Sequence, residues 1–167
     1  ISVGVNILPR IVENLVSGVR KRFQQNNRPI DIILAENLLH ADKMLHSLIC
    51  EHLTPNEVEL FDKNIGLVEA SIGRMVPVMT EEMFKGNILR ICVESYCELP
   101  VDKAAFKGDI PAIPHLRAFQ PFDFFIKRKL YIHNMGHALT AYLGGLFGYE
   151  YIWQAIENPA IKLMVQR

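Results

Sequence analysis

The sequence predicts an α/β fold in which an open parallel sheet is followed by a mainly helical region. Short apolar runs at 1–6 and 30–35 alternate with helical patterns at 11–23 and 41–50. Strand, helix, strand and helix within about 50 residues is the rhythm of βαβ units. A strong helical pattern at 123–144 follows a proline-rich stretch, and prolines at this density indicate a boundary between two regions.

Each element of the expected sheet region has its own signal. The helix at 11–23 has apolar residues spaced four apart and ends in Arg20-Lys21-Arg22, cations that suit the negative end of a helix dipole. The run IDIILA at 30–35 resembles strands that are buried on both faces of a parallel sheet. We also expect a short helix at 55–63, extended segments at 66–77 and 88–99, a loop at 107–122 and a helix at 151–166.

The domain boundary is expected between Pro100 and Phe122, and we assign 1–105 to the sheet domain and 106–167 to the helical domain. Eighteen basic and eighteen acidic residues cancel, so the chain has no charge footprint for nucleic acid or an anionic membrane. Half of the residues are hydrophobic, yet no apolar run approaches the length of about 18 that a membrane span needs. These features predict a soluble, cytoplasmic globular protein, with its three cysteines as buried thiols.

One helix carries side chains that could handle a reacting oxygen. Around a helical wheel, Lys129 lies about 80° from His137 and about 140° from Asn134, so the three share one broad face. A desolvated lysine can take a proton from an alcohol near neutral pH. Asn and His can donate hydrogen bonds to the oxygen as charge builds on it. Packed imidazole and surface charge explain the same pattern, and His133 with His137 could equally bind a metal, although no HExxH glutamate accompanies them.

Polar residues also stand where strands of the predicted sheet end. Asn6 follows the first apolar run, and Glu36 and Asn37 follow the second. Ligands of open α/β sheets bind beyond the carboxyl ends of the strands, which makes these residues candidates for a crevice. Residues of these types also cap turns, so their position alone leaves both readings open.

The spacing Lys129-x4-Asn134-x2-His137, followed by ALTAYLG at 138–144, resembles the signature of the polyol-specific long-chain dehydrogenases. Four further blocks agree in order: VGVN at 3–6, IILAEN at 32–37, VEASIGRMVP at 68–77, and VES at 93–95 with VDK at 101–103 and FKG at 106–108. The resemblance implies the C-terminal part of a Rossmann-like parallel sheet followed by the start of a mainly α-helical substrate domain. It also implies metal-independent, NAD-dependent oxidation of a secondary alcohol to a ketone.

In the family's scheme the lysine that matches Lys129 is the general base, and the residues that match Asn134 and His137 bind and polarise the oxygen. Asn37, with Asn6, is then expected at the cofactor. The cofactor supplies the hydride chemistry, while the protein supplies orientation and proton handling. The motif blocks favour mannitol 1-phosphate and fructose 6-phosphate as the substrate pair, with Arg128 and Arg74 as candidate phosphate ligands. Lys127 is a third cation in a suitable position.

Two departures from the family's pattern bear on function. No G-x-G-x-x-G turn occurs, so we expect the chain to lie inside a longer parent protein and to be inactive and weak in NAD binding by itself. Gly73 stands where relatives commonly carry aspartate. Alternatives are therefore a sugar-phosphate sensor or assembly module without turnover, a dehydrogenase for unphosphorylated mannitol or a hexuronate, and a hydrolase built on the two histidines. The oligomeric state is left open.

Overall fold

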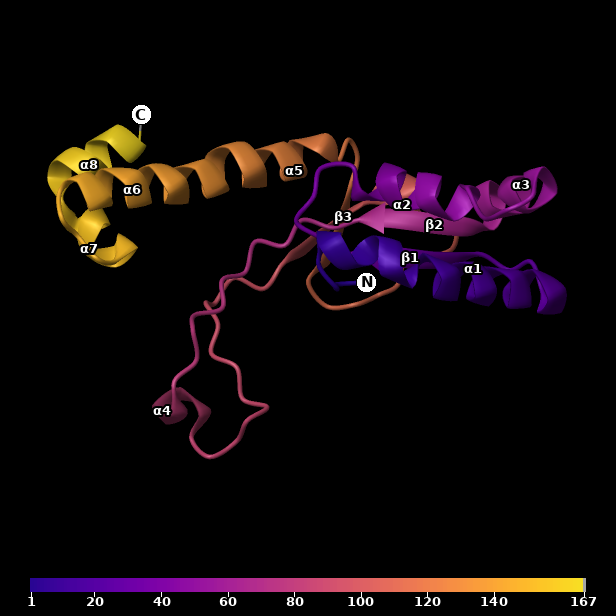
Figure 1. Ribbon diagram of the computed structural model, residues 1–167, viewed down its shortest axis with the longest axis horizontal. Coiled ribbons are helices and arrows are strands. Elements are labelled where there is room, and N and C mark those ends of the chain that lie inside the picture. Colours follow the sequence, from indigo (N-terminus) through magenta and orange to yellow (C-terminus); the bar gives the residue numbers. More distant parts are fainter. Residues whose placement is uncertain (167) are drawn as a thin grey trace. The chain divides into compact units, whose positions relative to one another are not determined.

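The computed structural model describes residues 1–166 and divides the chain into two compact units, Ile1–Phe122 and Asp123–Arg167. The first unit contains both strand pairs, and the described residues of the second form helices and their connections, without a strand (Figure 1). The predicted α/β class is confirmed. The division falls at 122/123 and not at 105/106, because a strand at Leu116–Phe119 pairs back onto the first unit.

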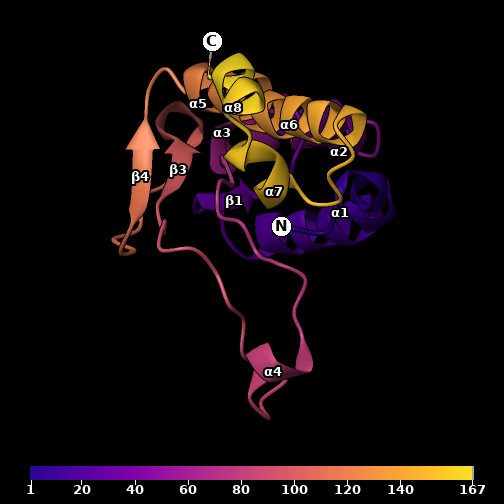
Figure 2. The same ribbon diagram turned by 90° about the vertical axis from the view of Figure 1, so that its left-hand side faces the viewer.

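The first unit is built on two parallel strand pairs. Strand β1 (Ile30–Leu34) pairs with β2 (Ile65–Glu69), and β3 (Leu99–Asp102) pairs with β4 (Leu116–Phe119), as Figure 2 shows for the second pair. Backbone bonds join the pairs, because Ser71 N–H donates to the carbonyl of Pro100 at 3.0 Å. Its helical elements are η1 (Val5–Ile7), α1 (Leu8–Gln25), α2 (Ala41–Cys50), α3 (Pro55–Asn64), α4 (Glu81–Phe84) and η2 (Lys103–Ala105).

Two apolar clusters hold this unit together, one on each face of the β1–β2 pair. On one face Ile65 and Leu67 pack with the apolar sides of α1, α2 and α3. On the other, Val68 packs with Val101 and the residues of β3 and β4. All five residues of β2 are buried, which is typical of a strand covered on both faces. The helices of the βαβ pattern therefore form where the periodicity predicts them.

Several expected elements of the first unit differ from the structure, and the extended segment at 66–77 is a strand only as far as Glu69. Residues 1–6 form no strand. Only Ile1 bonds alongside β1, since its amino group donates to Ile33 O and its carbonyl accepts from the Ala35 N–H just after the strand, before Gly4 adopts φ 88° and the chain turns into η1. The expected strand at 88–99 is irregular up to Leu99. The expected loop at 107–122 contains β4, whose four residues include none of its prolines.

Residues 72–98 instead form an arm that extends away from the strand pairs, with α4 at its tip (Figures 1 and 2). Its two limbs are joined by Arg74 Nε, which donates to Tyr96 O, and by Met75 N–H, which donates to Glu94 Oε1 at 2.7 Å. The β-branched residues that suggested a strand are largely exposed, with Ile91 63% and Ile88 83% accessible. Strand propensity did not yield a strand here because no neighbouring strand pairs with these limbs.

The second unit is one long helix followed by two short ones. Its elements are α5 (Asp123–Arg128), η3 (Lys129–Asn134), α6 (Met135–Leu146), α7 (Ile152–Glu157) and α8 (Pro159–Val165). The short helices pack on α6, and a Cβ added at Gly144 would lie 2.7 Å from Cβ of Ala155. The expected helix at 151–166 is split because Asn158 caps α8 ahead of Pro159. Within residues 1–166, no helix combines the length and apolar character needed to cross a membrane.

Candidate active site

The Lys129–Asn134 segment is a π-helical turn inserted between the α-helices α5 and α6. In a π-helix each backbone N–H bonds to the carbonyl five residues earlier, and such single turns occur frequently at functional sites. Residues five apart therefore approach one face more closely than they do in an α-helix. Lys129 and Asn134 are five apart, so the π turn reduces the separation of about 140° that an α-helical wheel assigns to them.

His137 follows Asn134 by three residues, at the start of α6, which places it beside Asn134 on the helix surface. Lys129 and Asn134 are half-buried, whereas His137 is exposed. The three predicted residues thus share one helical segment of the second unit, at positions whose side chains can meet on one face.

Burial has a direct electrostatic consequence for Lys129. Desolvation lowers the pKa of its ammonium from the ordinary value of 10.5, because the charged form loses hydration that the neutral amine does not need. A lysine with a lowered pKa holds a larger share of neutral amine near neutral pH. That is the form that can accept a proton.

Two histidine rings meet on the same segment. The rings of His133 and His137 are in edge-to-face contact, with centroids 4.5 Å apart and planes at 64°. Among residues 1–166, no third His, Cys, Asp or Glu joins this pair at metal-ligand distance. Two histidines are fewer ligands than the three or four protein side chains of a zinc site.

The part of the chain that the structure describes has one group of three metal-type ligands, His40, Asp42 and Glu69, whose donor atoms lie within 4.8 Å of one another. Glu69 Oε1 already accepts the Ala41 N–H at 3.0 Å. Glu69 and Asp42 both lie at the N-terminus of α2, where free N–H groups and the helix dipole stabilise carboxylates without a cation. Glu69 thus caps α2, whereas Asp42 Oδ1 is buried without a hydrogen-bond partner among the described residues.

Arg128, a candidate phosphate ligand, lies beside two aromatic rings. Its guanidinium carbon is 5.7 Å from the ring centroid of Phe124 and 5.1 Å from that of Phe125. Stacking of this kind restricts the guanidinium while its N–H groups remain able to bind an anion. Lys127 is exposed and lies 3.6 Å from Asp123, as a solvated helical pair does.

The remaining predicted residues belong to the first unit. Asn37 is exposed and follows the carboxyl end of β1 by three residues. Asn6 lies in η1 and not at a strand end. The buried carboxylate of Glu36 joins these segments, because it accepts N–H bonds from Val3 at 2.7 Å and from Gly4 at 3.0 Å. Both asparagines therefore belong to segments that meet at the end of β1.

Arg74 and Gly73 lie at the base of the arm. Arg74 is exposed and its Nε bonds to the Tyr96 carbonyl. A Cβ at Gly73 would lie 3.3 Å from the Tyr96 ring, so the aromatic ring lies against the position where the resemblance implies a carboxylate.

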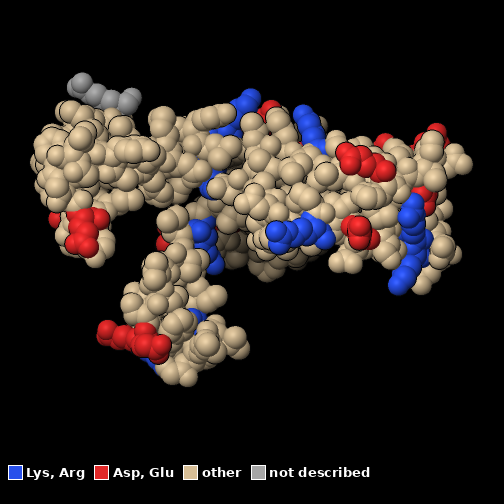
Figure 3. Space-filling model, in the orientation of Figure 1, with Lys and Arg blue, Asp and Glu red and all other residues tan. Residues whose placement is uncertain are grey.

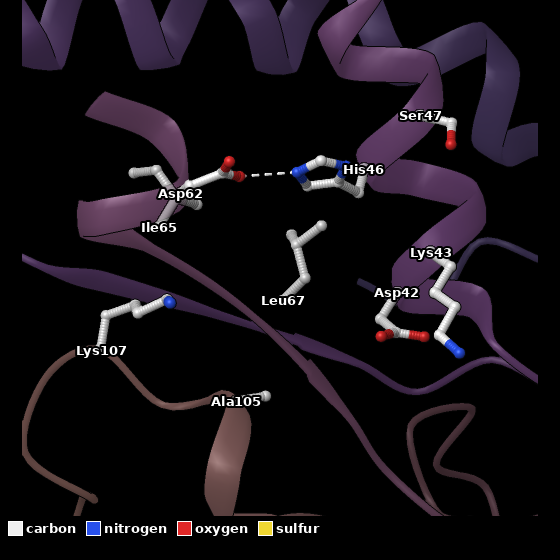
Figure 4. Close-up of a pocket in the computed structure, with 9 residues that line it drawn as sticks. All are labelled: Asp42, Lys43, His46, Ser47, Asp62, Ile65, Leu67, Ala105 and Lys107. Carbon is white, nitrogen blue, oxygen red and sulfur yellow. Dashed lines mark hydrogen bonds and ion pairs between the residues drawn. The ribbon is translucent and has the colours of Figure 1, made fainter. Parts of the chain in front are cut away.

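A cavity of about 420 Å³ lies in the first unit between α2, α3, β2 and the residues after η2 (Figure 4). Its polar lining includes Asp62, which bonds to His46 Nε2 at 2.7 Å, and Lys107. None of the predicted site residues lines it. Cys50 lies 3.6 and 3.7 Å from the two ring nitrogens of His46, and burial raises the pKa of its thiol. That combination does not activate a nucleophile.

Comparisons with known proteins agree with this two-part arrangement. Residues 1–115 match the family model of the mannitol dehydrogenase Rossmann domain, and residues 122–167 match that of the mannitol dehydrogenase C-terminal domain. The chain belongs to the mannitol dehydrogenase family. The expected membership of the polyol dehydrogenases is thereby confirmed.

Two solved structures show the same fold. A D-sorbitol dehydrogenase in substrate-free form has a TM-score of 0.81 at 17% identity, over 96% of this chain and 37% of that chain. A Pseudomonas fluorescens mannitol 2-dehydrogenase, solved as a ternary complex with NAD and D-mannitol, has a TM-score of 0.75 at 14% identity, over 93% of this chain and 34% of that chain. The chain therefore spans just over a third of the length of each relative.

Three features of the site region were not predicted from the sequence: the π turn, the contacts of Glu36 and the exposure of the thiols. The π turn was missed because the helical wheel assumes uniform α-helical winding. The anchoring role of Glu36 was missed as well, although a glutamate directly after a buried strand is itself a signal, since an acidic side chain there must find donors. The thiols are also less buried than expected, with Cys50 and Cys92 half-buried and Cys97 exposed.

Proposed function

We propose that the chain carries the proton-transfer residues of an NAD-dependent oxidoreductase that oxidises a secondary alcohol of a polyol to a ketone. The observation that carries the proposal is Lys129: its pKa is lowered by burial, and it opens a π turn that ends at Asn134. Family membership supports the class of reaction. The relative solved with NAD and D-mannitol supports the cofactor and a polyol substrate.

In this proposal neutral Lys129 accepts the hydroxyl proton as the alcohol is oxidised. The Asn134 amide and the His137 ring donate hydrogen bonds to the same oxygen, which stabilises the negative charge that develops on it. NAD, when bound, accepts the hydride from the substrate carbon. The lowered lysine pKa sets the direction of the pH dependence, since oxidation needs the neutral amine and speeds up as pH rises through that pKa.

Among the described residues, we assign binding roles only toward the nicotinamide end of NAD. Asn37 and Asn6 belong to segments that meet at the carboxyl end of β1, where α/β proteins bind nucleotide cofactors, and we assign them to the nicotinamide side. No glycine-rich turn joins a strand to a helix within residues 1–166, so no group there is assigned to the pyrophosphate. We therefore expect weak binding of NAD by this chain alone.

For the substrate we propose the mannitol 1-phosphate and fructose 6-phosphate pair. Arg128, restrained by Phe124 and Phe125, follows the phenylalanines on the helix that carries the base and is the assigned phosphate ligand. Arg74 is a weaker assignment, because its Nε is bonded within the arm. An unphosphorylated polyol such as mannitol is the alternative, and it requires no cation at either position.

One observation favours a second candidate function, sugar-phosphate binding without turnover. Gly73 supplies no carboxylate, and a Cβ added there would lie 3.3 Å from the Tyr96 ring, so a larger side chain requires the ring to shift slightly. If that carboxylate is required for chemistry, the site binds substrate and does not convert it.

The test is a pair of matched lysine variants in a form of the protein that turns over polyol. With NAD and mannitol 1-phosphate, or with NAD and mannitol, Lys129→Met is expected to lower kcat by about 10²- to 10⁴-fold, the usual contribution of a general base. Lys162→Met, which removes an exposed lysine from α8 of the same unit, is the control and should retain activity. Activity that survives in Lys129→Met would remove Lys129 from its role. Substrate binding without turnover in the unsubstituted protein would select the second candidate.

A further inference from the structure

His137, which has a proposed role at the substrate oxygen, contacts His133, which has no role in that proposal. His137 is exposed, whereas His133 is half-buried, and their rings meet edge to face with centroids 4.5 Å apart. The two residues are four apart and span the junction between the π turn and α6. The half-buried His133 ring, which is more restricted, therefore lies against the exposed His137 ring, which is freer to rotate.

An imidazole that donates to a reacting oxygen needs a fixed ring orientation and tautomer. Both are normally set by what the remainder of the ring contacts. An exposed histidine side chain otherwise samples several staggered rotamers, and fixing it at the moment of reaction costs conformational entropy. Aromatic edge-to-face packing is a contact that restricts such a ring.

We infer that His133 is a positioning residue, whose ring holds the His137 imidazole in the orientation that donates to the substrate oxygen. The inference rests on the proposed function for the role of His137. His133 itself need not touch the substrate. The contact it supplies is ring packing, so a phenyl ring at the same position is able to replace it and a methyl group is not.

The inference is tested on the 167-residue chain by ¹⁵N NMR of the histidine rings. Three variants are compared: His133→Ala, His133→Phe, and Ile132→Ala as a matched control, since Ile132 is an exposed neighbour in the same π turn. In His133→Ala the His137 ring nitrogens are expected to shift toward the averaged values of an unrestrained imidazole. In His133→Phe and in the control they should stay near those of the parent chain.

Helix content by circular dichroism and the thermal midpoint identify a variant that has lost its fold. Because His133→Phe keeps the aromatic volume, it keeps the test decisive if the alanine variant is poorly folded. Unchanged His137 ring signals in a folded His133→Ala chain would overturn the inference. A His133→Phe chain whose ring signals move as far as those of the alanine variant would overturn it too.

A kinetic comparison separates this inference from the proposed function. In a form of the protein that turns over polyol, His133→Ala should lower kcat by about tenfold through misorientation, with KM changed less and His133→Phe close to the parent. If Lys129→Met is active, the proposed function fails, while the NMR result still decides whether His133 orients His137. If Lys129→Met is inactive and His133→Ala is fully active, the positioning role fails by itself.

Discussion

The carboxylate of Asp31 on β1 accepts hydrogen bonds from the backbone N–H groups of Lys107, at 2.7 Å, and Gly108, at 3.2 Å. This contact ties a strand near the start of the chain to a segment 76 residues further on. The carboxylate crosses over Gly66 on the neighbouring strand β2, where a Cβ would collide with Asp31 Oδ1 and lie 2.6 Å from Ala105 O. One acidic residue and one glycine thus join the β1–β2 pair to the segment that follows η2.

Replacing Asp31 with asparagine should destabilise the first unit. The amide keeps the size of the side chain, but its NH₂ group cannot accept a hydrogen bond, so one of the two backbone N–H groups loses its acceptor. We expect the free energy of unfolding to fall by about 1–3 kcal/mol, measured by urea denaturation. Asp109→Asn, at an exposed aspartate nearby in sequence, is the control. Equal unfolding midpoints for the two variants would contradict the stabilising role of the Asp31 carboxylate.

Gly66→Ala should be destabilising for a steric reason. The added methyl group has to displace the Asp31 side chain or the backbone at Ala105, and overpacking of this kind costs about 1–3 kcal/mol. The matched control is Gly18→Ala in the middle of α1, where a Cβ meets nothing within 4 Å. There the substitution should stabilise by about 0.5–1 kcal/mol. The same denaturation experiment reads both, and a loss of stability in the control but not at Gly66 would contradict the prediction.

Acid should weaken the link between α1 and α3. Hydrogen bonds from Arg20 and from the Thr54 cap hold the pKa of Glu57 at about 2, below its ordinary value of 4.5. Below pH 4.5 the unfolded chain binds the proton and the folded chain does not, so this contribution is lost as pH falls from about 4.5 to about 2. Glu57→Gln should lack this acid dependence of the thermal midpoint.

For Glu57 the control is Glu59→Gln, at an exposed carboxylate on the same helix, which should follow the parent chain through the acid range. The carboxyl ¹³C shift of Glu57 gives a direct reading of its titration. A Glu57 midpoint close to 4.5 would show that the Arg20 contact at 2.8 Å does not persist in solution.

Lys129 should oppose folding at neutral pH. Because burial lowers its pKa from 10.5, the unfolded chain binds more protons than the folded chain between the lowered value and 10.5. Stability therefore rises with pH across that window, and the full penalty applies below it. Lys129→Met should be more stable than the parent at neutral pH, with the difference shrinking toward pH 10.5. Lys127→Met serves as the control in urea denaturation across this pH range, and a constant difference for Lys129→Met would contradict the prediction.

The sequence predicted helices and strands correctly where the apolar spacing of a segment itself shows which face the segment buries. Helices α1, α2 and α3 and strand β1 formed as expected, because their apolar spacing matches the faces they bury. The Val-rich limbs of the arm were assigned to a strand from propensity alone, and a strand needs a partner that the sequence does not reveal. Strand β4 was missed for the converse reason, since nearby prolines concealed four residues that pair with β3.

The site was predicted unevenly for a related reason. The helical positions of Lys129, Asn134 and His137 follow from the spacing, and the roles given to them stay predictions. The π turn depends on whether each N–H bonds to the carbonyl four or five residues earlier, and the residue types in this segment do not indicate which of the two bonds forms. The apolar run at 1–6 predicts a strand that ends at Asn6, whereas Gly4 turns the chain into η1 before that run is complete.

The wide turn at Lys129–Asn134 also affects how this helix can change in length over generations. A π turn within an α-helix is a local widening that the flanking α-helical segments tolerate, so loss of one codon from this segment can leave α6 packed on α7 and α8. The same loss would move Asn134 to the fourth position after Lys129. A single in-frame deletion would thus change the relative position of Lys129 and Asn134 while the helical unit keeps its packing. Comparing natural variants of different length in this segment would show whether such deletions have been selected.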